Sequence, residues 1–212
     1  MTVSLSKPML ARMFAEAAKL VREHCEELSR LDSIGGDGDH GTTMVRAMAV
    51  LEGDIEPANG ASLSEMLARA GWSVMGVDGG ASSALLGTFI AGMGDIELGE
   101  ELDCERLAAS FEAGLRAVSN RTKARPGDKT MMDALAPAVE AVRVAASSRR
   151  PIAAALKEAA DAAAAGAEST KHQVARHGRA KYLGEKTLGH ADAGATSIAL
   201  IFRGFATAVA EP

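Results

Sequence analysis

Apolar residues spaced three or four positions apart recur along almost the whole chain, within segments that are rich in alanine. This spacing is typical of helices that bury one face, and alanine has the highest intrinsic helix propensity. A half-buried strand requires alternating apolar and polar residues, and no convincing run of that pattern occurs. The sequence therefore predicts an all-α fold.

Eight helices are predicted from this periodicity and from residues that begin or end helices. Pro8 favours an early start for the first helix, and the second ends before the stretch 53–60, which contains Pro57. Gly178 is expected to end the seventh helix, which would be about 40 Å long by its rise per residue. The expected ranges are about 6–30, 41–52, 62–75, 82–93, 103–119, 130–147, 151–177 and 194–210. Short connections favour an antiparallel up-and-down bundle or helical barrel.

Length and charge limit the classes of protein that the chain can belong to. Its 212 residues are enough for one domain with a core, and we expect residues 1–212 to form a single domain. The net charge of −5 argues against a nucleic-acid partner, because such proteins usually present a basic face. No apolar stretch approaches the roughly 20 residues of a membrane span, and no secretory signal is visible. We expect a cytoplasmic protein without a membrane partner.

Four glycine-rich segments stand at helix junctions, where plain connections need far less glycine. They are residues 31–43, 76–83, 121–130 and 178–196. In an up-and-down bundle, the junctions after the first, third, fifth and seventh helices lie at the same end. The four segments are these junctions, so the sequence predicts that they converge on one site.

The first segment contains three aspartates, Asp32, Asp37 and Asp39, within a short glycine-rich stretch. Such crowding is unfavourable unless a cation is bound, and carboxylate oxygens suit a hard ion such as Mg²⁺ or Ca²⁺. An EF-hand is excluded, because Thr43 or Met48 stands where its twelfth-position glutamate is required. We therefore favour Mg²⁺, with the helix start that follows as a place for phosphate groups.

Two common nucleotide motifs are matched only in part. Residues 36–41 have the GxGxxG spacing, but a helix precedes them where the dinucleotide fold needs a strand. Residues 189–196 have the glycine spacing of a P-loop, but Ala195 replaces its lysine. Both motifs are rejected, although the turn before Thr196 and Ser197 remains a plausible anion or ribose contact.

Other candidate residues have two interpretations each. The helix start at Gly79–Ser83 is either a phosphate-binding turn or a tight interhelical connection. Arg179 and Lys181 would either neutralise a transferred phosphoryl group or be solvated surface charges. Among the histidines, His40 and His190 are the better candidates, because they lie in the glycine-rich segments.

Taken in order, the four segments resemble the nucleotide-binding L subunit of dihydroxyacetone kinases. The family's GDGDHG run and the helix after it match residues 32–44, and its glycine-serine stretch before GTF resembles residues 79–89. Its GDKTM run reappears at residues 127–138, and its GRA, YLGE and GATS run at residues 178–197. The resemblance covers nearly the whole chain.

The resemblance implies an eight-helix antiparallel barrel with a nucleotide site at one end, holding ADP or ATP and Mg²⁺, with two ions expected. It implies that Asp32, Asp37 and Asp39 hold the metal, that Arg179 is the catalytic residue facing the phosphates, and that Met131 lies beside the adenine. The implied nucleotide contacts are His40, Gly41, Thr42, Thr43, Gly80, Ala81, Ser82, Thr122, Met131, Arg179, Asp192, Ala193 and Gly194. Such a site suits phosphoryl transfer, which depends on positioning and charge neutralisation.

The chain departs from the family pattern at four positions. Thr43 stands where asparagine is usual, Ser83 and Thr122 where glycine is usual, and Ala193 where proline is common. These departures leave the loop geometry open, and with it the substrate.

The resemblance also implies a partner, because the family binds its ketose on a separate K subunit or domain through a histidine. The chain is then incomplete as a kinase of glycerol catabolism without that subunit. Two donors stay open: exchangeable Mg-ATP, or bound ADP that a phosphocarrier of the phosphotransferase system rephosphorylates. The ketose could be dihydroxyacetone or a tetrulose, and a homodimer is also left open. The alternatives are a non-catalytic nucleotide sensor that binds a regulator, and a helical scaffold without a ligand.

Overall fold

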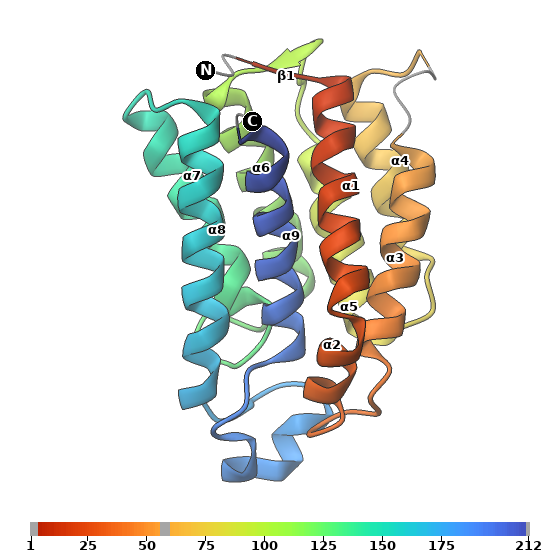
Figure 1. Ribbon diagram of the computed structural model, residues 1–212, viewed down its shortest axis with the longest axis vertical. Helices are drawn as coiled ribbons and strands as arrows, with labels where there is room; N and C mark the ends of the chain where they lie inside the picture. Colours follow the sequence, from red (N-terminus) through yellow and green to blue (C-terminus); the bar gives the residue numbers. More distant parts are fainter. Residues whose placement is uncertain (1–3, 56–59, 211–212) are drawn as a thin grey trace.

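The computed structural model describes residues 4–55 and 60–210, and these form a long helical barrel (Figure 1). The α-helices are α1 (Lys7–Glu23), α2 (Cys25–Asp32), α3 (His40–Asp54), α4 (Leu63–Met75), α5 (Gly80–Met93), α6 (Cys104–Arg121), α7 (Met132–Ser147), α8 (Ile152–Ser169) and α9 (Ala193–Val209). Two 3₁₀ segments, η2 (Thr170–His172) and η3 (Arg179–Thr187), lie between α8 and α9. None of the helices in the described ranges is long and apolar enough to cross a membrane.

Eight of the described helices form a closed ring. Helix α1 packs on α3, each helix from α3 to α8 packs on the next one, and α9 returns to α1. Neighbouring helices run in opposite directions, while α2 sits below α1 at one end (Figure 1). The predicted all-α, eight-helix antiparallel barrel is confirmed.

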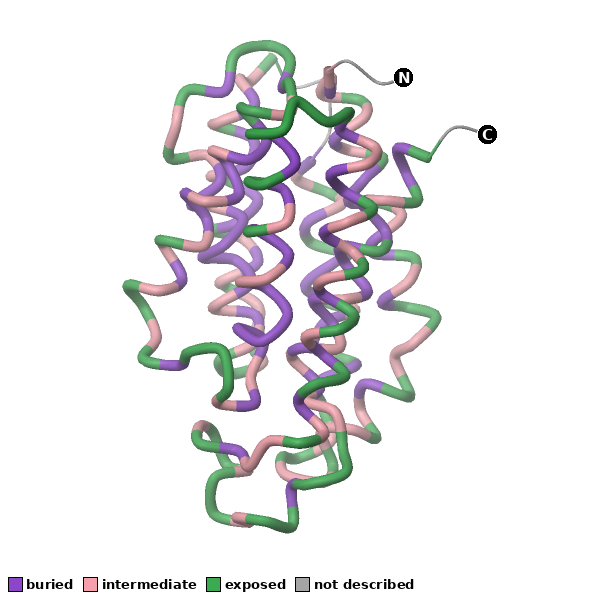
Figure 2. The backbone as a smooth tube through the Cα atoms, turned by 90° about the vertical axis from the view of Figure 1, so that its left-hand side faces the viewer, coloured by how far each residue is buried: buried purple, intermediate pink, exposed green. Residues whose placement is uncertain are grey.

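The interior of the ring contains a cluster of aromatic side chains among aliphatic ones. All five phenylalanines of the chain are buried there, among them Phe14, Phe111 and Phe205. The ring centroids of Phe14 and Phe205 lie 5.0 Å apart in an edge-to-face arrangement, which is favourable for aromatic pairs. Figure 2 shows buried residues along the inner faces of the helices and exposed residues concentrated on the outer faces and loops.

Small residues allow some helices to approach closely. A Cβ on Gly87 of α5 would lie 2.5 Å from the carbonyl oxygen of Gly71 in α4, so only glycine fits at this crossing. At the far end of the barrel, a short antiparallel pair joins β1 (Leu5–Ser6) to β2 (Glu101–Leu102). The sequence did not predict this pair, because two residues are too few to show alternation.

Most predicted helix ends agree with the structure to within two residues. The capping box at Ser62 and Glu65 and the N-cap at Asp103 are both present. Helix α3 continues to Asp54, and Pro57 lies outside the described residues.

Two predicted helices were wrong in their extent. The first is interrupted at His24, whose backbone leaves the helical region with φ −105° and ψ 14°, and so splits into α1 and α2. The seventh ends at Ser169 and not near His177, so Gly178 caps no α-helix and begins η3 instead.

The helix does not continue after α8, because the backbone and side-chain polar groups of the residues that follow form hydrogen bonds with other loops. The Gln173 side chain accepts a hydrogen bond from the N–H of Lys129, and the N–H of Arg176 donates to the Asp128 carbonyl. The N–H of Ala175 donates to the hydroxyl of Thr187. These contacts across loops replace the intrahelical bonds that the alanine-rich pattern predicted.

Candidate functional site

The lower end of the barrel in Figure 1 contains a cavity of about 630 Å³. Its wall includes residues from each of the four glycine-rich segments, such as Asp32, Gly79, Thr122 and Asp192. The predicted convergence of the four segments is therefore confirmed. It follows from the up-and-down ring, which brings alternate junctions to the same end.

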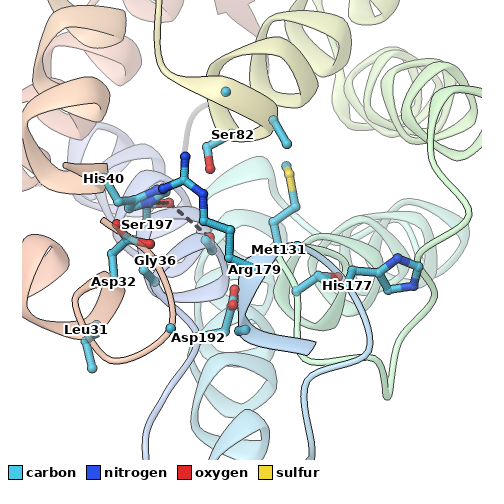
Figure 3. Close-up of a pocket in the computed structure, with 18 of the residues that line it drawn as sticks. Leu31, Asp32, Gly36, His40, Ser82, Met131, His177, Arg179, Asp192 and Ser197 are labelled. Carbon is cyan, nitrogen blue, oxygen red and sulfur yellow. Dashed lines mark hydrogen bonds between the residues drawn. The ribbon is translucent and has the colours of Figure 1, made fainter. Parts of the chain in front are cut away.

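Most of the predicted site residues line this cavity. They are Asp32, Asp37, Asp39, His40, Gly80, Ala81, Ser82, Thr122, Met131, Arg179, Asp192, Ala193 and Gly194. They come from segments far apart in the chain and, where Figure 3 labels them, surround one space.

Gly41, Thr42 and Thr43 are not part of the lining that the structure describes. A Cβ on Gly41 would lie 2.0 Å from the carbonyl oxygen of Cys25, so this glycine lets α3 pass against α2. The hydroxyl of Thr42 donates to the Asp39 carbonyl, and the hydroxyl of Thr43 accepts from Arg46 at 3.2 Å. All three residues lie in the first turn of α3.

The three aspartates form a cluster suited to a cation. One carboxylate oxygen from each of Asp32, Asp37 and Asp39 lies within 4.8 Å of the others. Asp32 is half-buried and accepts a hydrogen bond from the N–H of Gly38 at 2.8 Å, which fixes the loop. Desolvation and the neighbouring carboxylate of Asp37 raise the pKa of Asp39. Three convergent carboxylates without a nitrogen or sulfur donor fit Mg²⁺ better than zinc.

Arg179 stands next to this cluster, at the first residue of η3. Its guanidinium forms an ion pair with Asp37, and that hydrogen bond lowers the pKa of the Asp37 carboxyl. Lys181 has a different position, because its Nζ lies 4.8 Å from the centroid of the exposed Tyr182 ring and the residue does not line the cavity. Of the two predicted cations, only Arg179 lines the cavity.

His40 and Ser197 connect α3 to α9 behind the acidic cluster. The two side chains are buried, and His40 Nε2 lies 3.2 Å from the Ser197 hydroxyl oxygen. Because that hydroxyl donates to the Gly194 carbonyl, the ring nitrogen is the donor of the pair. Burial lowers the pKa of His40, so the imidazole is neutral near pH 7. It therefore acts as a neutral hydrogen-bonding group.

Two helices present their N-termini to the cavity. Helix α5 starts at Gly80, whose φ of +69° strongly favours glycine, and continues with Ala81 and Ser82. Helix α9 is capped by Asp192, whose carboxylate accepts from the N–H of Ala195 at 2.7 Å. Burial raises the pKa of Asp192 to about 6. Helix N-termini attract anions through free N–H groups and the helix dipole.

An apolar surface lies on another side of the cavity. In Figure 3, Met131 lies on the side of the drawn space opposite Asp32 and His40. Leu85, Leu86 and Ile198 also contribute to the wall. The cavity therefore joins a charged region to an apolar one, a combination that suits a ligand with a polar end and a flat apolar end.

The structure accommodates the other three residues that depart from the family pattern. Thr122 has extended backbone angles, φ −125° and ψ 151°, which any residue adopts. The buried hydroxyl of Ser83 donates to the Val77 carbonyl at 2.9 Å. Ala193 occupies the first turn of α9.

Two residues of the cavity wall received no role from the sequence. Lys129 is buried in the wall, and His177 lies at its edge, where its Nε2 is 3.2 Å from the Asp128 carboxylate. His177 was assigned to a helix, and a buried lysine is indistinguishable from a surface lysine in a sequence. The GDK run around Lys129 was the only available signal.

Comparison with known proteins relates this geometry to a family. The family model described as the DAK2 domain matches residues 34–207. The chain is 34% identical over 210 residues to the "PEP-dependent dihydroxyacetone kinase, ADP-binding subunit DhaL" of Escherichia coli, covering 99% of this chain and 100% of that subunit.

Longer proteins also match the chain. It is 34% identical over 205 residues to the D-erythrulose kinase of Mycolicibacterium smegmatis, covering 95% of this chain and 35% of that kinase. Among solved structures, the dihydroxyacetone kinase from C. freundii in complex with AMP-PNP and Mg²⁺ superposes with a TM-score of 0.74 at 27% identity. That match covers 98% of this chain and 35% of the C. freundii chain.

Proposed function

The chain belongs to the DAK2 domain family, and on that premise we propose that it is the nucleotide-binding, phosphoryl-transferring subunit of a short-ketose kinase. The observation that supports this function best is the composition of the cavity at the lower end of the barrel. An acidic cluster, the guanidinium of Arg179 and two helix N-termini surround one space beside an apolar wall. A nucleoside di- or triphosphate has the charges and the apolar ring that these groups would bind.

Each part of the cavity has a proposed role in binding. Asp32, Asp37 and Asp39 would hold Mg²⁺, which neutralises phosphate charge when bound. The N-termini of α5 and α9 would bind the phosphates through backbone N–H groups, and Met131 would contact the base. Arg179 would release Asp37 and turn to the transferred phosphoryl group, where positive charge stabilises the transition state.

The acceptor is proposed to be a short ketose on a separate K subunit. Relatives of the chain include a named ADP-binding subunit of a dihydroxyacetone kinase and a D-erythrulose kinase, so the acceptor class covers trioses and tetruloses. The first of these is also named PEP-dependent. This name supports the route in which bound ADP is rephosphorylated by a phosphocarrier, rather than exchange with free ATP.

The deciding experiment is the nucleotide content of the freshly purified protein, followed by titration with ADP and ATP with and without Mg²⁺. Near-stoichiometric ADP that resists exchange would support the phosphocarrier route. An empty protein that binds Mg-ATP reversibly would support direct use of ATP. Failure to bind either nucleotide in the presence of Mg²⁺ would overturn the proposed function.

Transfer to a K subunit separates a kinase from a sensor. The protein would be mixed with a purified ketose-binding subunit from a relative, the ketose and the phosphoryl donor. Formation of the ketose phosphate would support the kinase. Nucleotide binding without transfer to any such subunit would favour the non-catalytic sensor.

A further inference from the structure

Lys129 is a buried lysine in the cavity wall, with only 7% of its surface exposed. Its ammonium group donates to the carbonyl oxygens of Thr170 at 2.6 Å and His190 at 2.5 Å. It forms no ion pair with a carboxylate in the described ranges of the chain. Its backbone is left-handed, with φ +60°, which is uncommon for a residue with a side chain.

These hydrogen bonds connect three separate segments. Lys129 belongs to the loop before α7, Thr170 begins η2 after α8, and His190 lies in the stretch that enters α9. The contact at Thr170 extends further, because its hydroxyl accepts from the N–H of Asp192 at 2.8 Å. The carboxylate of Asp192 in turn caps α9 through the N–H of Ala195.

The segments that Lys129 joins carry proposed nucleotide contacts. Met131 follows two residues after it, and a Cβ on Gly194 would lie 3.4 Å from the Cβ of Met131. The wall that would contact the base and the turn that would contact the phosphates therefore meet next to this lysine. A shift of either loop would change the spacing between the two parts of the site.

The charges that face Lys129 are two carboxylates, Asp192 and Asp133. Asp133 is already satisfied, because its two oxygens accept from the N–H groups of Gly127 at 2.6 Å and Thr130 at 2.8 Å. The Asp192 carboxylate accepts from backbone N–H groups at the start of α9 and has the positive charge of Lys129 nearby. Because burial raises the pKa of Asp192, this carboxylate depends on the lysine to remain charged.

We propose that Lys129 is a positioning residue for nucleotide binding, one that holds Met131 against the turn at 192–194 and places its positive charge beside the cap of α9. The inference rests on the proposed function, because it concerns the same cavity. Lys129 acts through its neighbours, because its two carbonyl contacts occupy two of its three protons.

The pKa of Asp192, about 6 in the intact protein, supports this role. Lys129 lowers that pKa against the effect of burial. Removal of the lysine should therefore raise it, by about one unit for a single nearby charge. More of the cap would then be protonated near neutral pH, and the loss of binding would depend on pH.

The test compares Lys129→Met with the wild type by calorimetric titration with ADP and Mg²⁺ from pH 6.5 to 8.5. The measured quantity is the dissociation constant of the variant for Mg-ADP divided by that of the wild type at the same pH. This ratio cancels proton binding by the nucleotide itself. We expect this ratio to be about ten or more at pH 6.5. By pH 8.5 it should be smaller by a factor of roughly three, because Asp192 ionises in the variant over this range. Lys123→Met, an exposed lysine of the same loop outside the cavity wall, should leave the ratio near one.

The possible results separate this inference from the proposed function. Wild-type protein that fails to bind Mg-ADP contradicts the function itself. Wild-type binding with a Lys129→Met ratio near one, or with a ratio independent of pH, overturns the role of Lys129 alone. If Lys129→Met does not fold, Lys129→Gln, which keeps an N–H donor, should show the same pH-dependent ratio. Loss of folding in both variants would assign the lysine to folding and also overturn the proposal.

Discussion

Asp37 is the residue whose substitution separates the proposed function from a ligand-free scaffold. It belongs to the acidic cluster and pairs with Arg179 on the surface of the cavity mouth. We expect Asp37→Asn to weaken Mg-dependent nucleotide binding by about tenfold or more, because one of three carboxylates is lost. Calorimetric titration of ADP with and without Mg²⁺ measures this effect.

Asp95→Asn is the matched control for this prediction, because Asp95 is exposed and lies outside the cavity wall. It should bind Mg-ADP like the wild type. A scaffold without a ligand predicts a different result for Asp37→Asn, namely higher stability from relieved repulsion and no effect of nucleotide. That outcome would contradict the metal site.

A second prediction at the scale of one residue concerns Asp192 and the pH dependence of the free energy of unfolding. Its pKa is raised from 3.8 to about 6 in the folded protein, so the folded state holds this proton more tightly than the unfolded chain. The resulting stabilisation is complete below about pH 4 and is lost as the pH rises through 6. Urea unfolding from pH 4.5 to 7.5 should show the wild type losing on the order of 2 kcal/mol relative to Asp192→Asn. Parallel pH curves for the two proteins would show that burial does not perturb this carboxyl.

The sequence predicted the residues of the site better than their environments. The aspartates, Arg179 and the α9 turn, which the sequence singled out, all line the cavity in the structure. Lys129 and His177 were missed, since burial and contacts between loops depend on the fold. Gly41 stays a predicted nucleotide contact, and its close approach to Cys25 adds a packing requirement that the sequence did not show.

At the scale of helices, the close contact between α4 and α5 predicts that replacing Gly87 lowers the stability of the fold. Gly87→Ala places a methyl group 2.5 Å from the Gly71 carbonyl oxygen and 2.6 Å from the N–H nitrogen of Met75. The two helices must separate, which should cost about 1–3 kcal/mol despite the better helix propensity of alanine. Chemical denaturation measures the change in the free energy of unfolding.

Gly53→Ala in α3 is the matched control, because no atom lies within 4 Å of the added methyl group. There only the propensity should matter, and we expect a gain of up to about 1 kcal/mol. Equal effects at the two positions would show that the α4–α5 crossing relaxes without cost.

Helices were predictable where apolar periodicity and capping residues agreed, as at Ser62 and Asp103. Prediction failed after α8, where Gln173, Arg176 and Ala175 form their backbone and side-chain contacts with distant loops. Local sequence patterns carry no information about such partners. The β1–β2 pair was missed because its strands are too short to show alternation, and because Leu5 pairs with a residue almost one hundred positions away.

For the whole molecule, the ring predicts where a nucleotide would change the dynamics. The four loops at the cavity end should exchange their amide hydrogens more slowly when Mg-ADP is added, because ligand contacts oppose local opening. Residues 5–6 and 101–102 at the far end should be unaffected. Hydrogen exchange with mass spectrometry tests this, and uniform protection of the whole barrel would contradict a site confined to one end.

The ring also explains why the overall architecture was predictable from the sequence. Each helix packs on its neighbour in the chain, so the order of helices already determines the arrangement. The closure of α9 onto α1 joins the two ends of the sequence, and the even number of ring helices allows it with alternating directions.

An even number of ring helices also brings both described ends of the chain, at β1 and after α9, to the rim far from the cavity (Figures 1 and 2). A linker at either end would therefore leave the mouth of the cavity open. Such a barrel is suited to work either as a separate subunit or as a tethered module. Its relatives occur both as a chain of matching length and as about a third of a longer one.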